Sequence, residues 1–164
     1  MPAVAPLAAT ITGYSVGLFI HVLAVVLAFG PTFAFGFFVA AAEGSSPRSV
    51  PFVLRTITNV NRFMVTPGMI VLLLAGIYLV SDADISLSET YVSVGFVAII
   101  ALFGLVHGYF IPRGRKAEEL AERDLGSGDE LSAEYRALSK QMATVGQITG
   151  LIVVITIFFM VVKP

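Results

Sequence analysis

The run from Gly13 to Phe38, GYSVGLFIHVLAVVLAFGPTFAFGFF, constrains this chain more than any other stretch. It contains no Lys, Arg, Asp or Glu, and its one ionisable side chain is His21. An apolar run of about 20 residues or more is long enough to cross a bilayer as a helix. Three further runs, over about 63–80, 91–111 and 146–162, have the same character. We therefore expect four membrane-spanning helices, the first over about 13–38.

The composition agrees with a membrane protein and excludes several other classes. The chain has 164 residues, enough for one domain, and is 57% hydrophobic and 13% charged. Soluble domains carry about twice that share of charge. The net charge of −1 argues against nucleic acid as a partner, because phosphate binding needs a basic excess. The absence of Cys removes disulfides and Cys-ligated metals.

The polar segments between the runs predict how the helices begin and end. In EGSSPRSVP, Ser49 is placed to cap the second helix, and Pro51 suits its first turn. The third helix continues past the membrane as a charged helix, where Glu119 and Arg123 have the i,i+4 spacing of an ion pair. It turns near Gly126 and forms a helical hairpin, over about 113–142, with the start of the fourth helix.

Two apolar seams predict that the helices pack on one another outside the membrane. Both recur at spacings of three and four, the period of a helix-packing stripe: Val53, Ile57, Val60 and Met64 in the second helix, and Leu131, Tyr135, Leu138, Met142 and Val145 in the fourth. Short loops make successive helices antiparallel. We therefore predict an all-α, integral membrane, up-down-up-down four-helix bundle over residues 1–164, with helices that extend into the cytoplasm.

The distribution of basic residues predicts the orientation. Nine of the ten basic residues lie on one side, in or near the connection between the first and second helices or the connection between the third and fourth. Lys163 alone lies on the other side, with Asp82, Asp84 and Glu89. The positive-inside rule places both basic loops in the cytoplasm and both termini outside, in a bacterial inner membrane. Met1 to Thr12 makes a poor signal peptide, so we expect the first span to be retained.

Prolines and glycines predict the irregular and close-packed positions. Pro31 and Pro67 interrupt the first and second spans and should kink them. Three small-xxx-small pairs, which let helix backbones approach in a membrane, are Gly13 with Gly17, Gly104 with Gly108, and Gly146 with Gly150. We expect these glycines to lie at contacts between helices.

His21 and His107 are the ionisable residues within the spans, and such residues are functional candidates. Neutral imidazole binds haem iron, so one hypothesis is a haem b site at one or both, with Met160 as a second ligand to His21. Their depths differ by about 12 Å along the helices, which argues against one shared iron. The alternative is that each is a neutral residue hydrogen-bonded across the bundle. The sequence contains no other metal-spaced cluster.

A second polar group is predicted toward the cytoplasmic end of the spans. It comprises Pro31, Thr32, Asn61, Arg62, Thr66, Pro67, His107 and Tyr109. These residues either line a cavity for a small amphipathic molecule or form an interfacial girdle in which Arg62 binds lipid phosphate. No acidic residue lies in a span, which argues against proton relay, and no catalytic motif is present, so we do not expect an enzyme.

Several segments resemble a known group of proteins. IHVLAVVLAFGPTF from Ile20, GMIVLLLAGIYLV from Gly68, IPRGRK after the third span and the closing MVVKP resemble an uncharacterised family of bacterial four-helix membrane proteins. That family looks related to copper-resistance D domains and to membrane-type protoporphyrinogen oxidase. The resemblance implies a haem ligand at His21. It also implies an essential Lys in the third helix and a Trp with a Gly pair after the first-helix His. This chain has no Lys near the outer end of the third helix, and Phe29-Gly30-Pro31 stands where the Trp is expected.

Three hypotheses on function follow. The first is a non-enzymatic binding or accessory subunit that contacts the lipid bilayer and joins a larger membrane complex, through the hairpin around Leu120 to Leu138, or a homo-oligomer. The second is a haem b protein using His21 for electron transfer or haem handling. The third is a component of a small-molecule permease.

Overall fold

The computed structural model describes residues 11–164, and the part of the expected N-terminal lead before Ile11 lies outside them. The described chain is helical apart from short turns. Its elements are α1 (Gly13–Phe29), α2 (Thr32–Ser45), the 3-10 turn η1 (Pro47–Ser49), α3 (Val50–Val60), the π-helical η2 (Asn61–Val65), α4 (Thr66–Asp82), α5 (Thr90–Leu105), the π-helical η3 (Val106–Phe110), α6 (Ile111–Ser127) and α7 (Ala133–Val162).

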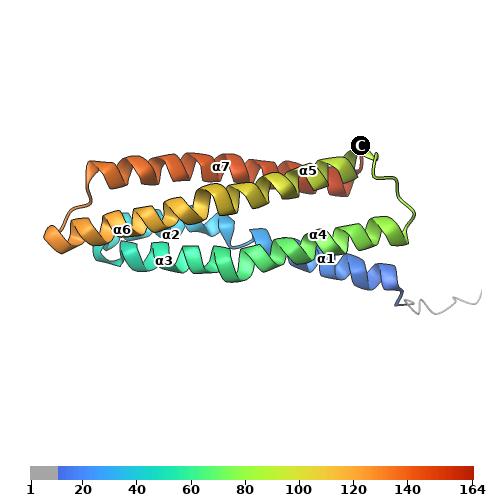
Figure 1. The fold of residues 1–164 in the computed structure, drawn as a ribbon, viewed down its shortest axis with the longest axis horizontal. Helices are drawn as coiled ribbons and strands as arrows, with labels where there is room; N and C mark the ends of the chain where they lie inside the picture. The colour runs from blue at the N-terminus through green and yellow to red at the C-terminus, as the bar shows by residue number, and fades with distance from the viewer. Residues whose placement is uncertain (1–10) are drawn as a thin grey trace, which may run out of the picture.

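These elements form four long helices, each apolar enough to cross a membrane: Gly13–Ser45, Pro47–Asp82, Thr90–Ser127 and Ala133–Val162. The predicted fold class, an all-helical four-helix membrane bundle, is confirmed. Figure 1 shows the long helices running side by side in alternating directions. We call the end that carries the α2–α3 and α6–α7 turns the tip, and the opposite end, with the α4–α5 loop and Val162, the base.

The helices exchange partners between the base and the tip. Near the base, α1 packs on α4 and α5 packs on α7, and the two pairs are separate ribbons in Figure 1. Near the tip, α3 packs on α6, and α2 and α7 complete a four-helix arrangement. The closest contacts thus form two pairs at one end, which one hydrophobic core joins, and a four-helix bundle at the other.

Local chemistry explains where the elements begin and break. Thr12 caps α1, because its hydroxyl accepts from the Ser15 N–H at 3.2 Å while the Ser15 hydroxyl accepts from the Thr12 N–H at 2.9 Å. The break between α1 and α2 falls at Gly30 and Pro31. After it, the Thr32 hydroxyl donates to the carbonyl of Phe29 at 2.6 Å, which satisfies an acceptor that the break leaves free.

The second long helix departs from the sequence expectations in two places. Ser49 does precede α3, but its hydroxyl donates to the Ser46 carbonyl at 2.7 Å and makes no cap. Pro67 lies in the first turn of α4, and the irregular backbone is the π-helical η2 just before it. A second π-helical segment, η3, stands in the same relation to Pro112 in the third long helix.

Two separate hydrophobic cores hold the bundle together. The base core lies between α1, α4, α5 and α7, and includes Ala28, Val65, Met69, Leu102 and Val153. The tip core lies between α2, α3, α6 and α7, and includes Val50, Leu54, Ala121, Leu131 and Tyr135. Tyr135, with 0% of its surface exposed, is the largest fully buried side chain of the described chain.

The predicted seam of the second helix is confirmed only in part, since Val53 and Val60 pack against the cores without being fully buried. The buried residues are Val50, Leu54, Thr58, Asn61 and Val65, whereas Met64 is exposed. Two of the buried positions are polar, so a search for apolar periodicity passed over them. The fourth-helix seam agrees with the structure, since Leu131 and Tyr135 are buried and Leu138 and Met142 pack against them.

Some glycines of the predicted pairs contact a side chain of another helix, and others do not. A Cβ at Gly17 would lie 2.6 Å from the Tyr78 ring, and one at Gly150 would lie 3.4 Å from Phe33, so both seat a side chain of another helix. No atom of another helix lies within 4 Å of a Cβ at Gly104, Gly108 or Gly146. Gly104 and Gly108 are exposed, so the expectation that they lie at contacts within the bundle is wrong, and the half-buried Gly146 seats no side chain of another described helix.

Candidate functional site

A layer of polar side chains separates the base core from the tip core. We call it the polar layer and define it as Thr58, Asn61, Thr66, His107 and Tyr109. It coincides with the irregular backbone of three long helices: α1 and α2 break beside η2, and Thr66, the residue after η2, contacts His107 of η3. Segments of π-helix recur at functional sites, because the extra residue redirects side chains and frees backbone groups. This makes the polar layer the candidate site of the membrane half.

A hydrogen-bonded contact between the first residue of α4 and η3 lies at the centre of the layer. The Thr66 hydroxyl donates to the Asn61 carbonyl at 2.8 Å, and its oxygen lies 3.2 Å from Nε2 of His107. A hydroxyl has one proton, so while Thr66 donates to Asn61 it accepts from an N–H at Nε2 of His107. The ring also lies against Phe103, with centroids 4.4 Å apart. His107 is thus a cross-helix hydrogen-bond donor, and this bond occupies its Nε2 atom.

Close approach of α3 and α6 accounts for the two buried polar residues of the layer. Thr58 is 8% exposed and Asn61 is 6% exposed, and Thr58 faces the third long helix. A Cβ at Gly114 would lie 3.0 Å from the Thr58 hydroxyl, so glycine admits the threonine there. Sequence reasoning missed both Thr58 and Gly114. For Thr58, the available signal was its i,i+3 spacing from Asn61. For Gly114, it was the presence of a glycine in a charged helix.

Tyr109 places a phenol between the membrane half and the charged half of the third long helix. Its hydroxyl is buried and has no hydrogen-bond partner among residues 11–164. The guanidinium of Arg113 lies over its ring, 4.3 Å from the centroid. Arg62 lies similarly over Phe63, at 5.6 Å. Cations are attracted to aromatic faces, so both arginines are held beside rings at this level.

The three candidate haem residues lie in three different places. His21 of α1 lies against Gly76 of α4. A Cβ at Gly76 would lie 3.3 Å from Cε1 of the His21 ring, so the glycine leaves room for the imidazole. Its Nδ1 is buried without a hydrogen-bond partner in the described chain, and the Leu72 carbonyl faces the ring without completing a bond. Met160 of α7 fills the space beside Gly95 of α5, and His107 is bonded to Thr66. Residues 11–164 contain no group of three His, Cys, Asp or Glu that could hold a metal ion.

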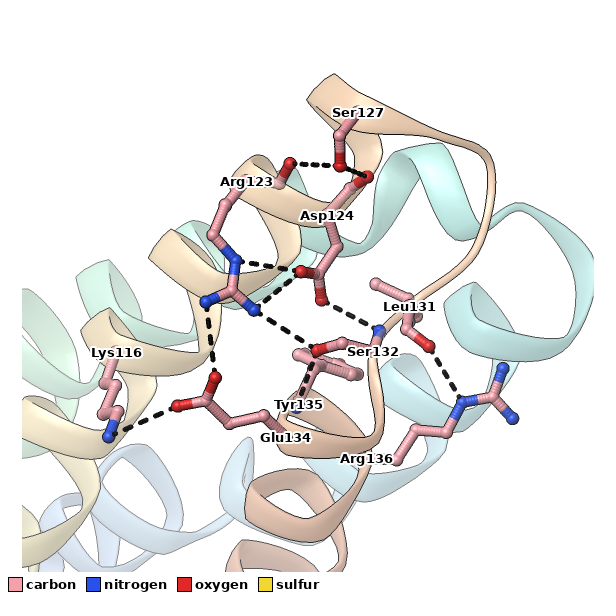
Figure 2. Close-up of polar contacts among 9 residues, drawn as sticks. All are labelled: Lys116, Arg123, Asp124, Ser127, Leu131, Ser132, Glu134, Tyr135 and Arg136. Carbon is pink, nitrogen blue, oxygen red and sulfur yellow. Dashed lines mark hydrogen bonds and ion pairs between the residues drawn. The ribbon is translucent and has the colours of Figure 1, made fainter.

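A second polar cluster closes the turn between α6 and α7 at the tip (Figure 2). We call it the tip cluster: Arg123, Asp124, Ser132 and Glu134. Asp124 accepts from Arg123 at 2.8 Å and from the Ser132 N–H at 2.9 Å, while the Ser132 hydroxyl caps α7. Hydrogen bonds from Ser132, and then from Arg123, lower the pKa of Asp124 to about 2. The expected pair of Glu119 with Arg123 is wrong, because Arg123 binds Asp124 and Glu134.

A buried carboxylate contact joins α2 to α7 next to the tip cluster. Glu43 accepts from the Tyr135 hydroxyl at 2.8 Å and from the Ser139 hydroxyl at 2.7 Å. Burial, and then the neighbouring Glu43 carboxylate, raise the pKa of the Tyr135 phenol, so Tyr135 acts as a hydrogen-bond donor. The contact joins the first and fourth long helices directly.

An apolar groove of about 360 Å³ runs between α2 and α3. Its lining residues carry no charge and include Phe38, Ala42, Phe52 and Ile57. Phe52 is 71% exposed, and Phe37 beside the groove is 77% exposed. One turn away, Arg55 donates to Glu118 and Glu122, each at 2.6 Å, so the groove adjoins a network of charged residues.

The fold and these contacts define a multi-pass integral membrane protein with four candidate spans. A family model described as "Predicted integral membrane protein (DUF2269)" matches residues 16–164, and the chain belongs to that family. This confirms membership of an uncharacterised membrane family and carries no link to copper-resistance D domains or to protoporphyrinogen oxidase. No curated protein and no solved structure matches the chain.

Proposed function

We propose that this protein is a non-enzymatic accessory subunit, which assembles with another integral membrane protein through the groove between α2 and α3. The observation that carries the proposal is the exposed apolar lining of this groove beside the ion pairs of Arg55. Ion pairs of this kind belong in water or among headgroups, because burying charge in hydrocarbon is costly. Lipid tails therefore do not cover the groove, and exposed apolar patches in water mark interaction sites.

The lengths of the helices support the same placement. The first long helix has no charged residue from Gly13 to Ala42, a run about 45 Å long at about 1.5 Å per residue. The hydrocarbon core is about 30 Å thick. If α1 begins at one face of the membrane, the apolar half of α2 extends beyond the other face. Contact with lipid therefore does not account for the exposed Phe37 and Phe38 in this half of α2.

The chemistry of the groove indicates an occupant. Its lining is uncharged and continues into the lipid-facing surface of the first long helix, so a helix leaving the bilayer beside α2 would fit it. The hairpin around Leu120 to Leu138, which the sequence suggested as the docking surface, exposes less apolar surface to a partner. Leu120 and Leu131 are buried in the tip core, and its outer surface is charged. We therefore place the partner's helix on α2 and α3.

Photo-crosslinking in native membranes tests this assignment. We would place p-benzoylphenylalanine at position 52 and, as a matched control on the opposite charged surface, at position 119. We expect position 52 to crosslink to one other integral membrane protein, which co-purifies with the wild type but not with Phe38→Ser/Phe52→Ser. Crosslinks only to lipid, or equal adducts at position 119, would reject the proposal. An adduct with a second copy of the chain would replace it with self-association.

We further propose that the tip lies in the cytoplasm of a bacterial cell, with the base and both termini outside. The support is the nine basic residues toward the tip, under the positive-inside rule. The chain has no Cys, so single cysteines report cleanly. In intact cells, Ser86→Cys should react with a membrane-impermeant thiol reagent and Ser127→Cys should react only after permeabilisation. The reverse pattern would invert the topology.

A second candidate function is haem b binding at His21, favoured by the buried Nδ1 that lacks a partner. The surrounding residues do not fit a two-ligand haem site, since Met160 packs on Gly95 and His107 bonds Thr66. Protein purified from its native membrane decides between the candidates. A Soret band that His21→Ala removes would establish haem binding, whereas a featureless spectrum would leave His21 as a packing residue. No contact described above favours a permease role.

A further inference from the structure

Six of the seven arginines of this protein fall into two groups that differ in their partners, and the seventh, Arg136 at the tip, donates to the Leu131 carbonyl. Toward the tip, Arg48, Arg55 and Arg123 each pair with a carboxylate. Arg62, Arg113 and Arg115 have no carboxylate within 4.0 Å anywhere in residues 11–164. We call these three the basic belt. Arg62 and Arg113 lie over aromatic rings instead.

Arg62 and Arg113 lie more than one helical turn from any acid of their own helices, whereas Arg115 lies one turn from Glu119 but does not pair with it. The second long helix contains no Asp or Glu from Val50 to Ser81, and the third contains none from Tyr91 to Ala117. The fourth contains none after Glu134. The three positive charges therefore form no ion pair within the described chain and are available to an anion from outside the molecule.

Two contacts show that the belt lies at one level of the bundle. Thr58 meets Gly114, and Thr66 meets His107, so α3 and η2 run antiparallel to η3 and α6. Arg62 lies between Thr58 and Thr66 along one helix, and Arg113 and Arg115 flank Gly114 on the other. Side chains from both helices thus reach the same narrow zone beside the polar layer.

This zone is where the surface changes from charged to apolar. On its base side, Phe63 is exposed, followed by the exposed Ile70 and Leu74. On its tip side, the ion pairs of Arg55 begin. In a membrane protein that boundary lies among lipid headgroups. We propose that the basic belt binds the phosphates of anionic lipids, with Tyr109 and Phe63 holding two of the guanidinium groups in place.

The arginine geometry suits this ligand. A guanidinium presents several donors in a fixed plane and binds phosphate oxygens in pairs, whereas an ammonium acts as a point charge. A free phosphate ion would have no reason to lie at the apolar boundary. A lipid phosphate is held there by its acyl chains, which would cover the exposed side chains on the base side of the belt.

Native mass spectrometry of the purified protein tests the proposal. The protein would be released from nanodiscs that contain equal amounts of phosphatidylglycerol and phosphatidylcholine, and the bound lipids counted. We expect enrichment of phosphatidylglycerol, and a fall of about fivefold for each belt arginine neutralised in Arg62→Gln/Arg113→Gln. The matched control, Arg55→Gln/Arg123→Gln, removes the same charge from paired arginines and should keep the enrichment. Arg62→Lys/Arg113→Lys should keep part of it.

Three outcomes would overturn the proposal. One is no preference for phosphatidylglycerol in the wild type. Another is an equal loss in both Gln doubles at unchanged melting temperature, which would mean that net charge alone attracts the lipid. The third is displacement of the bound lipid by millimolar inorganic phosphate, which would identify a free anion as the ligand. Circular dichroism of each variant in detergent establishes that it is folded.

Discussion

The tip half and the base half of this molecule are packed by different rules. The tip core encloses Tyr135 and Ala121 completely, and polar clusters tie its turns together. In the base half, only 6% of the most apolar stretch of α7 is buried, and large side chains such as Phe19 and Val97 face outward. Water drives apolar side chains together, whereas lipid tails do not. The difference is what we expect of a bundle whose tip half lies in water and whose base half lies in lipid.

The contacts between helices differ in the same way. At the tip, apolar side chains from four helices, among them Leu54, Leu120 and Tyr135, form one buried core. In the base half, α1 and α4 meet through small residues, and a Cβ at Gly68 would lie 3.2 Å from the backbone of Ala28. Close backbone approach replaces side-chain burial where no hydrophobic force acts between helices. Three predictions sharpen this comparison, from the largest effect to the smallest.

Tyr135→Ala should cause the largest loss of stability. It opens a cavity in the tip core and leaves Glu43 with one partner, at a cost of about 3–5 kcal/mol. Tyr135→Phe keeps the ring and should cost about 1 kcal/mol. Phe19→Ala, which removes a lipid-facing ring of similar size, should change little. Thermal unfolding in detergent measures all three, and equal losses at positions 135 and 19 would refute the contrast.

Gly68→Leu should destabilise the base half through overpacking. The added side chain collides with the backbone of Ala28, which cannot move aside, at a cost of about 2 kcal/mol. Gly104→Leu meets open space and should not destabilise, since Leu is also the better helix former. We would compare the melting temperatures of the two variants. A loss at Gly104 as large as that at Gly68 would restore the contact expected from sequence and contradict the structure.

Acidification should weaken the tip through Asp124. Its pKa is lowered in the folded protein from the ordinary 3.8 to about 2, so folding favours the ionised form. That contribution is complete above about pH 5 and is lost as the pH falls toward 2. Between pH 5 and pH 2, Asp124→Asn should therefore lose less stability than the wild type, as followed by circular dichroism melts. Asp129→Asn, at an exposed site, should behave as the wild type, and parallel curves for all three would contradict the assignment.

How far the sequence predicts this protein depends on the kind of residue. Uncharged runs, polar turns and the seam from Leu131 to Met142 foretold four antiparallel helices that extend past their apolar parts. The same reasoning failed for the second helix, where Thr58 and Asn61 are buried although polar. It also overestimated Gly104 and Gly146, because a small-xxx-small pair has the same spacing whether it faces a helix or lipid.

The candidate site was only partly within reach of the sequence. His107, Thr66, Asn61 and Tyr109 were grouped from their similar depth, and the structure joins His107 to Thr66. The π-helical segments and the Gly114 contact were not foreseen, since an added residue in a helix leaves no mark in apolar periodicity. Asp124 was also missed, because its partners, Arg123 apart, lie across the α6–α7 turn rather than along one helix.

The sequence by itself determined which segments are suited to lipid and which to water, and with that the class of protein. It could do so because the length of an apolar run and the placement of charges are local properties of the chain. Only the tertiary structure decided which faces meet. Gly68 meets Ala28 while Gly104 meets nothing, and Arg55 finds carboxylates while Arg62 finds none. Those outcomes depend on the rotation and register of each helix, which are set by contacts between residues far apart in the chain and not by the pattern of any one segment.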